Sequence, residues 1–176
     1  MPILPIVARP LTADAYAPFG AVVMASPRGE PGRPVNQGTA RRWDNLASLE
    51  NLRPGTAALN VSVFRCEPRA PGAIPVALLE KHPASTQVFL PMTARRYLVI
   101  VALGGERPDL ATLSAFVASG AQGISYSPGV WHHPMIALDT QVDFACLVWE
   151  DGSEDDCAEV RLSDAERPRI EIPADI

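Results

Sequence analysis

Two neighbouring histidines, His132 and His133, are the residues of this chain best suited to acid–base or metal chemistry. The 176-residue sequence has only three histidines, and these two stand between a tryptophan and a proline. Pro134 keeps the backbone of His133 extended, which predicts a strand here. Because side chains alternate along a strand, only one of the pair can face a site, and we expect it to be His132. The alternative is that both are packing residues whose ring nitrogens bond backbone carbonyls.

The third histidine, His82, stands in the stretch LEKHPASTQVFLPM, close to Lys81 and Gln87. A metal site of a double-stranded β-helix is expected to use two histidines two positions apart, but Ala84 occupies the second position. The sequence therefore predicts no compact three-histidine site. A weaker ligand set of His82, Gln87 and His132 remains open, because such nitrogen and oxygen donors can hold nickel, manganese or zinc.

One arginine, Arg65, is predicted to lie on an otherwise apolar strand face. The two-residue period of a strand places it on the same side as Leu59, Val61 and Val63. A buried guanidinium without a partner has a large desolvation cost, so Arg65 needs an anion. Two partners are open: a protein carboxylate such as Glu80, or a substrate carboxylate held by both prongs of the guanidinium.

Short apolar runs separated by turn-forming residues predict that these side chains are positioned by strands. The 18 prolines and 12 glycines fall mainly between the runs. Regularly spaced strands without helices between them favour a sandwich or barrel, in which the run Tyr97 to Leu103 needs cover on both faces. We expect a short helix capped by Thr12, and a long mobile loop, Ser26 to Gly38, of the kind that often acts as a lid near a site. The predicted strands include 58–65, 86–91, 96–105, 113–118, 123–127, 132–138 and 142–149.

Composition limits the classes of function. A chain of 176 residues with 47% hydrophobic residues predicts one domain, 1–176, and the net charge of −5 makes nucleic acid a poor partner. No window reaches the roughly 18 apolar residues of a membrane helix. The three cysteines form no C-x-x-C pair, which is typical of reduced thiols, so a soluble cytoplasmic protein is expected.

Several of these stretches together resemble the ureidoglycolate lyase family. They are LEKHPASTQVFLPM, the GVWHHP signature with the strands before it, the hairpin VALGGERPDL and the early segment VNQGTARRWDNL. The resemblance covers nearly the whole chain. It implies an all-β, cupin-type double-stranded β-helix, or jelly-roll barrel, with a few short helices. It also implies a homodimer that acts in allantoin breakdown, with a divalent metal, nickel, and no organic cofactor.

The implied reaction assigns roles to the candidate residues. Ureidoglycolate bears a hydroxyl and a urea nitrogen on one carbon, so its cleavage to glyoxylate and urea needs a carboxylate clamp, a base and an acid. We expect Arg65 to be the clamp, His132 the base or a metal ligand, and His82 its partner. Lys81 is an alternative source of positive charge. The candidates for binding the rest of the substrate are Gln87, Tyr126 and, from the loop that closes over the site, Asn36.

Three other functions remain as alternatives. An amidohydrolase would release ammonium from the same ureido acid, and it needs an activated water. A non-catalytic cupin that binds a small acid would keep Arg65 but would not need two histidines at one cavity. A metal-dependent isomerase or dioxygenase is disfavoured by the missing pair of histidines.

Overall fold

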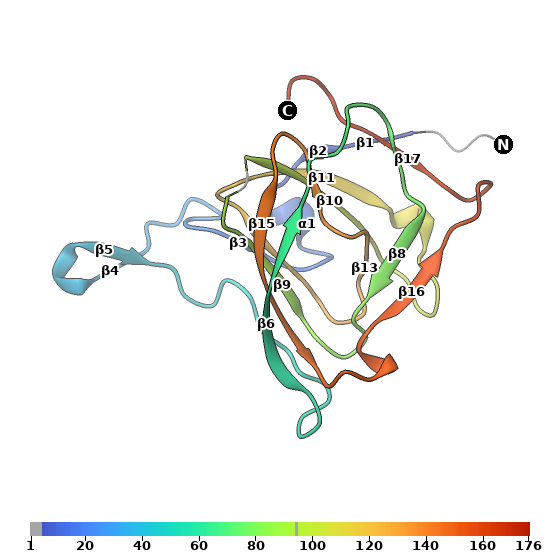
Figure 1. Ribbon diagram of the computed structural model, residues 1–176. Coiled ribbons are helices and arrows are strands. Elements are labelled where there is room, and N and C mark those ends of the chain that lie inside the picture. The colour runs from blue at the N-terminus through green and yellow to red at the C-terminus, as the bar shows by residue number, and fades with distance from the viewer. Residues whose placement is uncertain (1–4, 94) are drawn as a thin grey trace.

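The computed structural model describes residues 5–93 and 95–176 and shows an all-β protein, as the sequence predicts. Two large sheets wrap around each other into a barrel (Figure 1). In the described residues, the helices are limited to a single turn of α-helix and three 3-10 turns, and none is long and apolar enough to cross a membrane. Their bounds are α1 Ala13–Tyr16, η1 Asn36–Gly38, η2 Leu110–Thr112 and η3 Glu154–Asp156.

The first sheet follows the order β16-β8-β13-β10-β11-β2, with β14 also paired to β10. The second sheet follows the order β3-β12-β9-β15-β6. In the first sheet the bounds are β2 Arg9–Pro10, β8 Leu78–Lys81, β10 Arg96–Ala102, β11 Ser114–Ser119, β13 Trp131–His132, β14 Ile136–Ala137 and β16 Ala158–Arg161. In the second they are β3 Val22–Val23, β6 Ala58–Cys66, β9 Gln87–Pro91, β12 Gly123–Tyr126 and β15 Val142–Glu150.

The chain crosses repeatedly from one large sheet to the other. Strand β8 belongs to the first sheet and β9 to the second, β10 and β11 return to the first, and β12 lies in the second again. Strand β13 lies in the first sheet, β15 in the second and β16 in the first again. Crossing of this kind between two mainly antiparallel sheets is the connectivity of a jelly roll, so the predicted cupin-type fold is confirmed.

The central strand β10 is buried on both faces, as the unbroken apolar run predicts. Tyr97, Val99 and Val101 point into the core between the two sheets. Leu98 and Ile100 point the other way, into a second core. This second core is covered by the small sheet β1-β17-β7, with bounds β1 Ile6–Val7, β7 Ile74–Pro75 and β17 Arg169–Glu171.

Thr12 caps α1 as predicted, accepting a hydrogen bond from the Ala15 amide at 3.3 Å. The predicted long loop at Ser26 to Gly38 is a loop only over residues 26–32, because its second half forms strand β4 (Arg33–Val35) and a 3-10 turn. Strands β4 and β5 (Ala40–Arg42) pair into a hairpin that projects from the barrel (Figure 1). We call residues 30–44 the arm.

Candidate active site

Three side chains that can bind a proton or a metal ion converge where strands β8 and β13 pair. Glu80 lies directly opposite His132 in this antiparallel pair. His82 follows two positions after Glu80 and therefore points to the same side. Ligand atoms of the three residues all lie within 4.8 Å of one another. We call Glu80, His82 and His132 the site cluster.

His132 is fixed by contacts on both its edge and its face. Its Nδ1 lies 3.0 Å from the carbonyl oxygen of Val130, which can only accept a hydrogen bond, so this nitrogen is the donor. The ring stacks on Tyr126 with 3.9 Å between ring centroids and 7° between planes. In the neutral ring, Nε2 therefore carries the lone pair. This atom is buried, has no hydrogen-bond partner among the described residues, and lies 3.6 Å from Oε1 of Glu80.

A backbone carbonyl also fixes the ring of His82. Its Nδ1 lies 2.9 Å from the carbonyl oxygen of Asp156, which leaves Nε2 available to the site cluster. The two histidine rings are 5.7 Å apart between centroids. Burial lowers the pKa of His82, and the nearby His132 lowers it further, although the Asp156 carbonyl and Glu80 act in the opposite direction. His82 is thus biased towards the neutral form that accepts a proton or binds a metal.

The charge of Glu80 is stabilised by its neighbours. Burial of this half-buried carboxyl opposes ionisation. The nearby imidazole of His132, 3.6 Å away, together with that of His82, outweighs this effect and lowers the pKa of Glu80. The site cluster thus offers one carboxylate oxygen and two imidazole nitrogens.

A hollow of about 350 Å³ opens beside His82 and has room for a small acid. Gln87, at the start of β9, is buried in its wall, and its Oε1 has no hydrogen-bond partner among the described residues. Burial raises the pKa of Cys146 in the same wall to about 11, so this thiol is protonated at neutral pH and is a poor nucleophile. The residues that line the hollow are Asn60, Ser62, Val63, Phe64, His82, Gln87, Cys146, Val148 and Glu150. We call this hollow the site pocket.

The structure places two of the predicted charged residues outside the site pocket. Arg65 does share a face with its apolar neighbours, but that face is the exposed outer side of β6. Its guanidinium makes a two-pronged ion pair with Asp143, at 2.8 Å for each prong. Lys81 points away from Glu80 and His82, because neighbours in a strand alternate. Its ammonium bonds the Gly105 carbonyl at 2.6 Å and lies 4.6 Å from the centre of the Trp131 ring.

The other two predicted substrate-binding residues also lie elsewhere. Tyr126 is fully buried behind His132, and its hydroxyl donates to the Met135 sulfur at 3.4 Å. It supports the ring of His132 and does not face the site pocket. Asn36 lies at the tip of the arm, which projects from the barrel (Figure 1). Of the predicted residues, the structure therefore brings together His82, Gln87 and His132.

The sequence reasoning missed Glu80 as a member of the site cluster. Glu80 and His82 form a Glu-x-His pair, and the two-residue period of a strand puts such a pair on one face. The pattern of two histidines expected for this fold places the second ligand after His82, at Ala84, whereas here the second ligand, Glu80, precedes His82. Asn60 and Ser62 were also missed, because no local signal shows that β6 turns these two residues towards the site.

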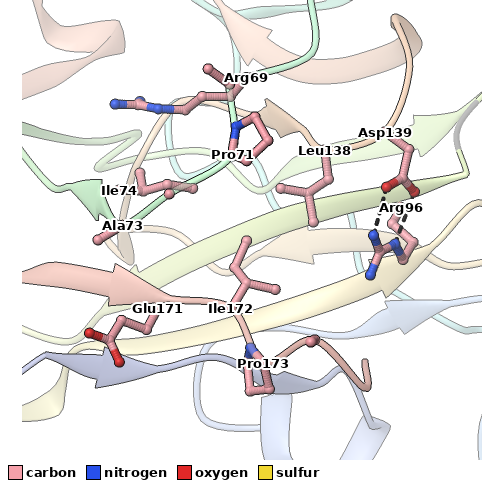
Figure 2. Close-up of a pocket in the computed structure, with 13 residues that line it drawn as sticks. Arg69, Pro71, Ala73, Ile74, Arg96, Leu138, Asp139, Glu171, Ile172 and Pro173 are labelled. Carbon is pink, nitrogen blue, oxygen red and sulfur yellow. Dashed lines mark hydrogen bonds and ion pairs between the residues drawn. The ribbon is translucent and has the colours of Figure 1, made fainter.

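A larger hollow, of about 540 Å³, lies beneath the C-terminal segment. Figure 2 shows its lining, in which Arg96 is paired with Asp139. Arg69, Pro71 and Ile172 form much of the remaining wall. No histidine or cysteine lines it. The smaller site pocket is the better candidate because it adjoins the site cluster.

The site cluster fits a divalent metal ion. Two imidazoles and a carboxylate that converge beside the site pocket supply three ligands and leave further positions open, as catalytic sites do. The lone pair of His132 Nε2 is buried and unpartnered, and the second nitrogen of each histidine is fixed by a backbone carbonyl. This support orients the rings in the way that metal-binding histidines require.

Fold and site together define a cupin-type barrel with a histidine and carboxylate site at the end of its first sheet. The chain belongs to the ureidoglycolate lyase family, whose model matches residues 3–168. A ureidoglycolate lyase of Burkholderia cepacia is 44% identical over 156 residues, covering 86% of this chain and 83% of that protein. One from Pseudomonas syringae pv. tomato is 36% identical over 159 residues, covering 90% and 91%. A dTDP sugar isomerase from Desulfovibrio desulfuricans matches in structure with a TM-score of 0.45 and 16% identity, covering 84% of each chain.

Proposed function

We propose that this protein is a carbon–nitrogen lyase that cleaves ureidoglycolate to glyoxylate and urea in the breakdown of allantoin. The names of its relatives and the family match support this activity. The observation that carries the proposal is the site cluster itself, next to the unpartnered amide oxygen of Gln87. Cys66, Cys146 and Cys157 are free thiols, which supports the reducing cytoplasm as the place of action.

The reaction requires one proton to leave an oxygen and one to reach a nitrogen. When the hydroxyl of ureidoglycolate loses its proton, the oxygen electrons form the carbonyl of glyoxylate and the carbon–nitrogen bond breaks. The bonding electrons go to the urea nitrogen, which takes up a proton. No water is consumed, so a base, an acid and positioning groups suffice.

The side chains of the site cluster can carry these protons. The lone pair of His132 Nε2 accepts the hydroxyl proton, and Glu80, 3.6 Å away, stabilises the imidazolium that forms. The proton held on His132 then passes to the departing nitrogen, and His82, which burial biases towards the neutral form, can relay it through its Nε2 lone pair. Gln87 Oε1 accepts a hydrogen bond from an N–H of the ureido group, which orients the leaving nitrogen.

Glu80, His82 and His132 would hold a divalent ion such as nickel, and the two histidines would then be ligands instead of proton carriers. A bound divalent ion supplies the positive charge that favours the ionised form of the substrate hydroxyl. Gln87 orients the ureido group with or without a bound metal ion, because its amide is not part of the site cluster.

Product analysis with and without metal tests this proposal. Chelator-treated protein is given racemic ureidoglycolate, and glyoxylate, urea and ammonium are measured against a control without enzyme. Equal amounts of glyoxylate and urea establish the lyase. Dependence of this turnover on added nickel assigns the histidines as ligands. Ammonium in place of urea would instead identify an amidohydrolase, and no turnover in any condition would mean that the proposed activity is wrong.

A further inference from the structure

The described residues that line the site pocket include no cationic side chain for the carboxylate of the proposed substrate. Neither arginine nor lysine is found among the described residues that line it, while the carboxylates of Glu80 and Glu150 lie at or next to its wall. A substrate carboxylate that is removed from water beside two acidic groups needs a positively charged partner. Since the need arises from an acidic substrate, this inference rests on the proposed function.

The arm carries three exposed arginines, and one of them has no acidic partner. Arg33 and Arg42 lie opposite each other in the hairpin and both pair with Asp44. Arg41 lies one position along and so points to the other face. Its only hydrogen bonds within the described residues go to the carbonyls of Pro31 and Gly32, each at 3.2 Å. The charge of Arg41 is therefore not neutralised within the described part of the chain.

The arm projects outward from the barrel of its own chain (Figure 1). Its base adjoins α1 and β3, where Val22, Arg28 and Asp44 line a common hollow. Strands β3 and β6 are the two edges of the second sheet, and four strand spacings, roughly 19 Å, separate them. Figure 1 shows the hairpin extending outward from the barrel. The arm is thus placed to reach another molecule.

The outer face of β6 is an apolar surface next to the site pocket. β6 is a nine-residue edge strand, and three of its outward side chains, Leu59, Val61 and Val63, are 40%, 65% and 62% exposed. Exposed apolar edge strands are normally covered or blunted in native proteins. Asn60 and Ser62 on the inner face of the same strand line the site pocket. A molecule that covers β6 therefore also stands beside the site pocket.

We propose that a second copy of this chain covers the outer face of β6 and that the partner subunit's Arg41 enters the site pocket as the clamp for the substrate carboxylate. The basic arm and the acidic site pocket are complementary in charge. A second copy of the chain fits as the partner, because each chain has one arm and one site pocket. In a two-fold symmetric dimer, each arm would complete the site of the other chain, and no further copy could be added.

The size of the particle tests the docking step. Light scattering during size-exclusion chromatography should give twice the mass of the chain. Val61→Asp, which places a charge on the proposed interface, should give the mass of one chain with an unchanged circular dichroism spectrum. In hydrogen exchange, amides 33–42 should be protected in the wild type and exposed in the Val61→Asp variant. A monomeric wild type, or equal exchange of these amides in both proteins, would contradict the docking step.

Mixed dimers test whether the arm acts across the interface. His132→Ala removes the site in one chain, and Arg41→Ala removes the clamp in the other. Each variant alone should lose most activity. A mixed dimer, purified through two different tags, holds one site with an intact His132 and an intact arm from the partner, so it should regain about half of the wild-type turnover. A mixed dimer as inactive as its two parents would show that the arm acts within its own chain.

Substrate affinity tests the clamp itself. Arg41→Ala should raise KM about tenfold or more, and Arg41→Lys should rescue it only in part, because lysine keeps the charge but loses the fork. Arg28→Ala, a matched control outside the arm hairpin whose guanidinium pairs with Asp14, should leave KM unchanged. An unchanged KM in Arg41→Ala would overturn the clamp. If wild-type protein does not cleave ureidoglycolate, the proposed function fails, while the mass and exchange measurements still decide the docking step.

Discussion

Glu80 faces His132 across the pairing of β8 with β13, with 3.6 Å between the carboxylate Oε1 and the imidazole Nε2. The pairing register holds the two residues opposite each other, whether their side chains share a proton or bind one metal ion. The buried nitrogen has no other partner among the described residues.

Replacing His132 should abolish both metal binding and turnover. His132→Asn removes the Nε2 lone pair and should lower the rate by about 100-fold or more. Nickel bound per chain, measured by equilibrium dialysis and metal analysis, should fall with it. His133→Asn is the matched control, because the described contacts of the neighbouring imidazole are to the Pro134 carbonyl at 2.7 Å and not to the site cluster. Equal nickel binding in wild type and His132→Asn would contradict the ligand role.

Gln87 should contribute to substrate binding through its amide oxygen. Gln87→Leu keeps most of the side-chain volume but removes the acceptor, and a lost hydrogen bond of this kind costs about 1–2 kcal/mol, or roughly a tenfold higher KM. The measurement is steady-state kinetics with ureidoglycolate. Gln141→Leu, at an exposed position where the amide bonds Glu67, serves as the control. If Gln87→Leu keeps the wild-type KM, Oε1 does not bind the ureido group.

Tyr126 should act through its ring and not through its hydroxyl. Tyr126→Phe keeps the stacking on His132 and loses only the bond to Met135, so activity should stay within about twofold of wild type. Tyr126→Leu removes the stacked ring and should lower kcat. Equal losses in both variants would favour the substrate-binding role that the sequence suggests for the hydroxyl.

Arg53 should position His82 from outside the site cluster. It pairs with Asp151 and Asp156, and the backbone carbonyl of Asp156 accepts the Nδ1–H of His82. Arg53→Gln should loosen this loop and weaken nickel binding by about 10-fold, the range seen when groups that support metal ligands are lost. Isothermal titration with nickel measures the change. Arg161→Gln, an exposed ion-pair partner of Glu159, should bind nickel like the wild type.

The Arg65–Asp143 pair should make stability depend on pH in the acid range. The hydrogen bond from Arg65 holds the pKa of Asp143 below its ordinary value. The stabilising effect is therefore complete above the unfolded-state pKa, about 3.9, and is lost as pH falls through the lower folded-state pKa. Asp143→Asn should lower Tm slightly at neutral pH, and the difference from wild type should vanish in strong acid. A difference that grows with acidity would contradict this assignment.

The sequence alone predicted most of the long strands and which side chains share a strand face. The apolar run of β10 and the turn residues between short runs are local signals that the structure confirms. The strand predicted at 132–138 is interrupted, because β13 ends at His132 and β14 begins at Ile136, and β4 lies in the stretch predicted to be a loop. Side-chain alternation was also sufficient to separate His132 from His133 and to group Arg65 with its apolar neighbours. By the same alternation, Glu80, two positions before His82, lies on the same strand face as His82, and Lys81 lies on the opposite face.

Only the tertiary structure decided which face of each strand meets the interior. Alternation divides β6 into two faces, but closure of the barrel turns Asn60 and Ser62 inward and leaves Arg65 outside with Asp143. The direction of the arm likewise depends on how β3 joins the edge of the second sheet. These outcomes follow from contacts between residues far apart in the chain. Local patterns carry no information on them, because a strand has the same two-residue period whichever face is buried.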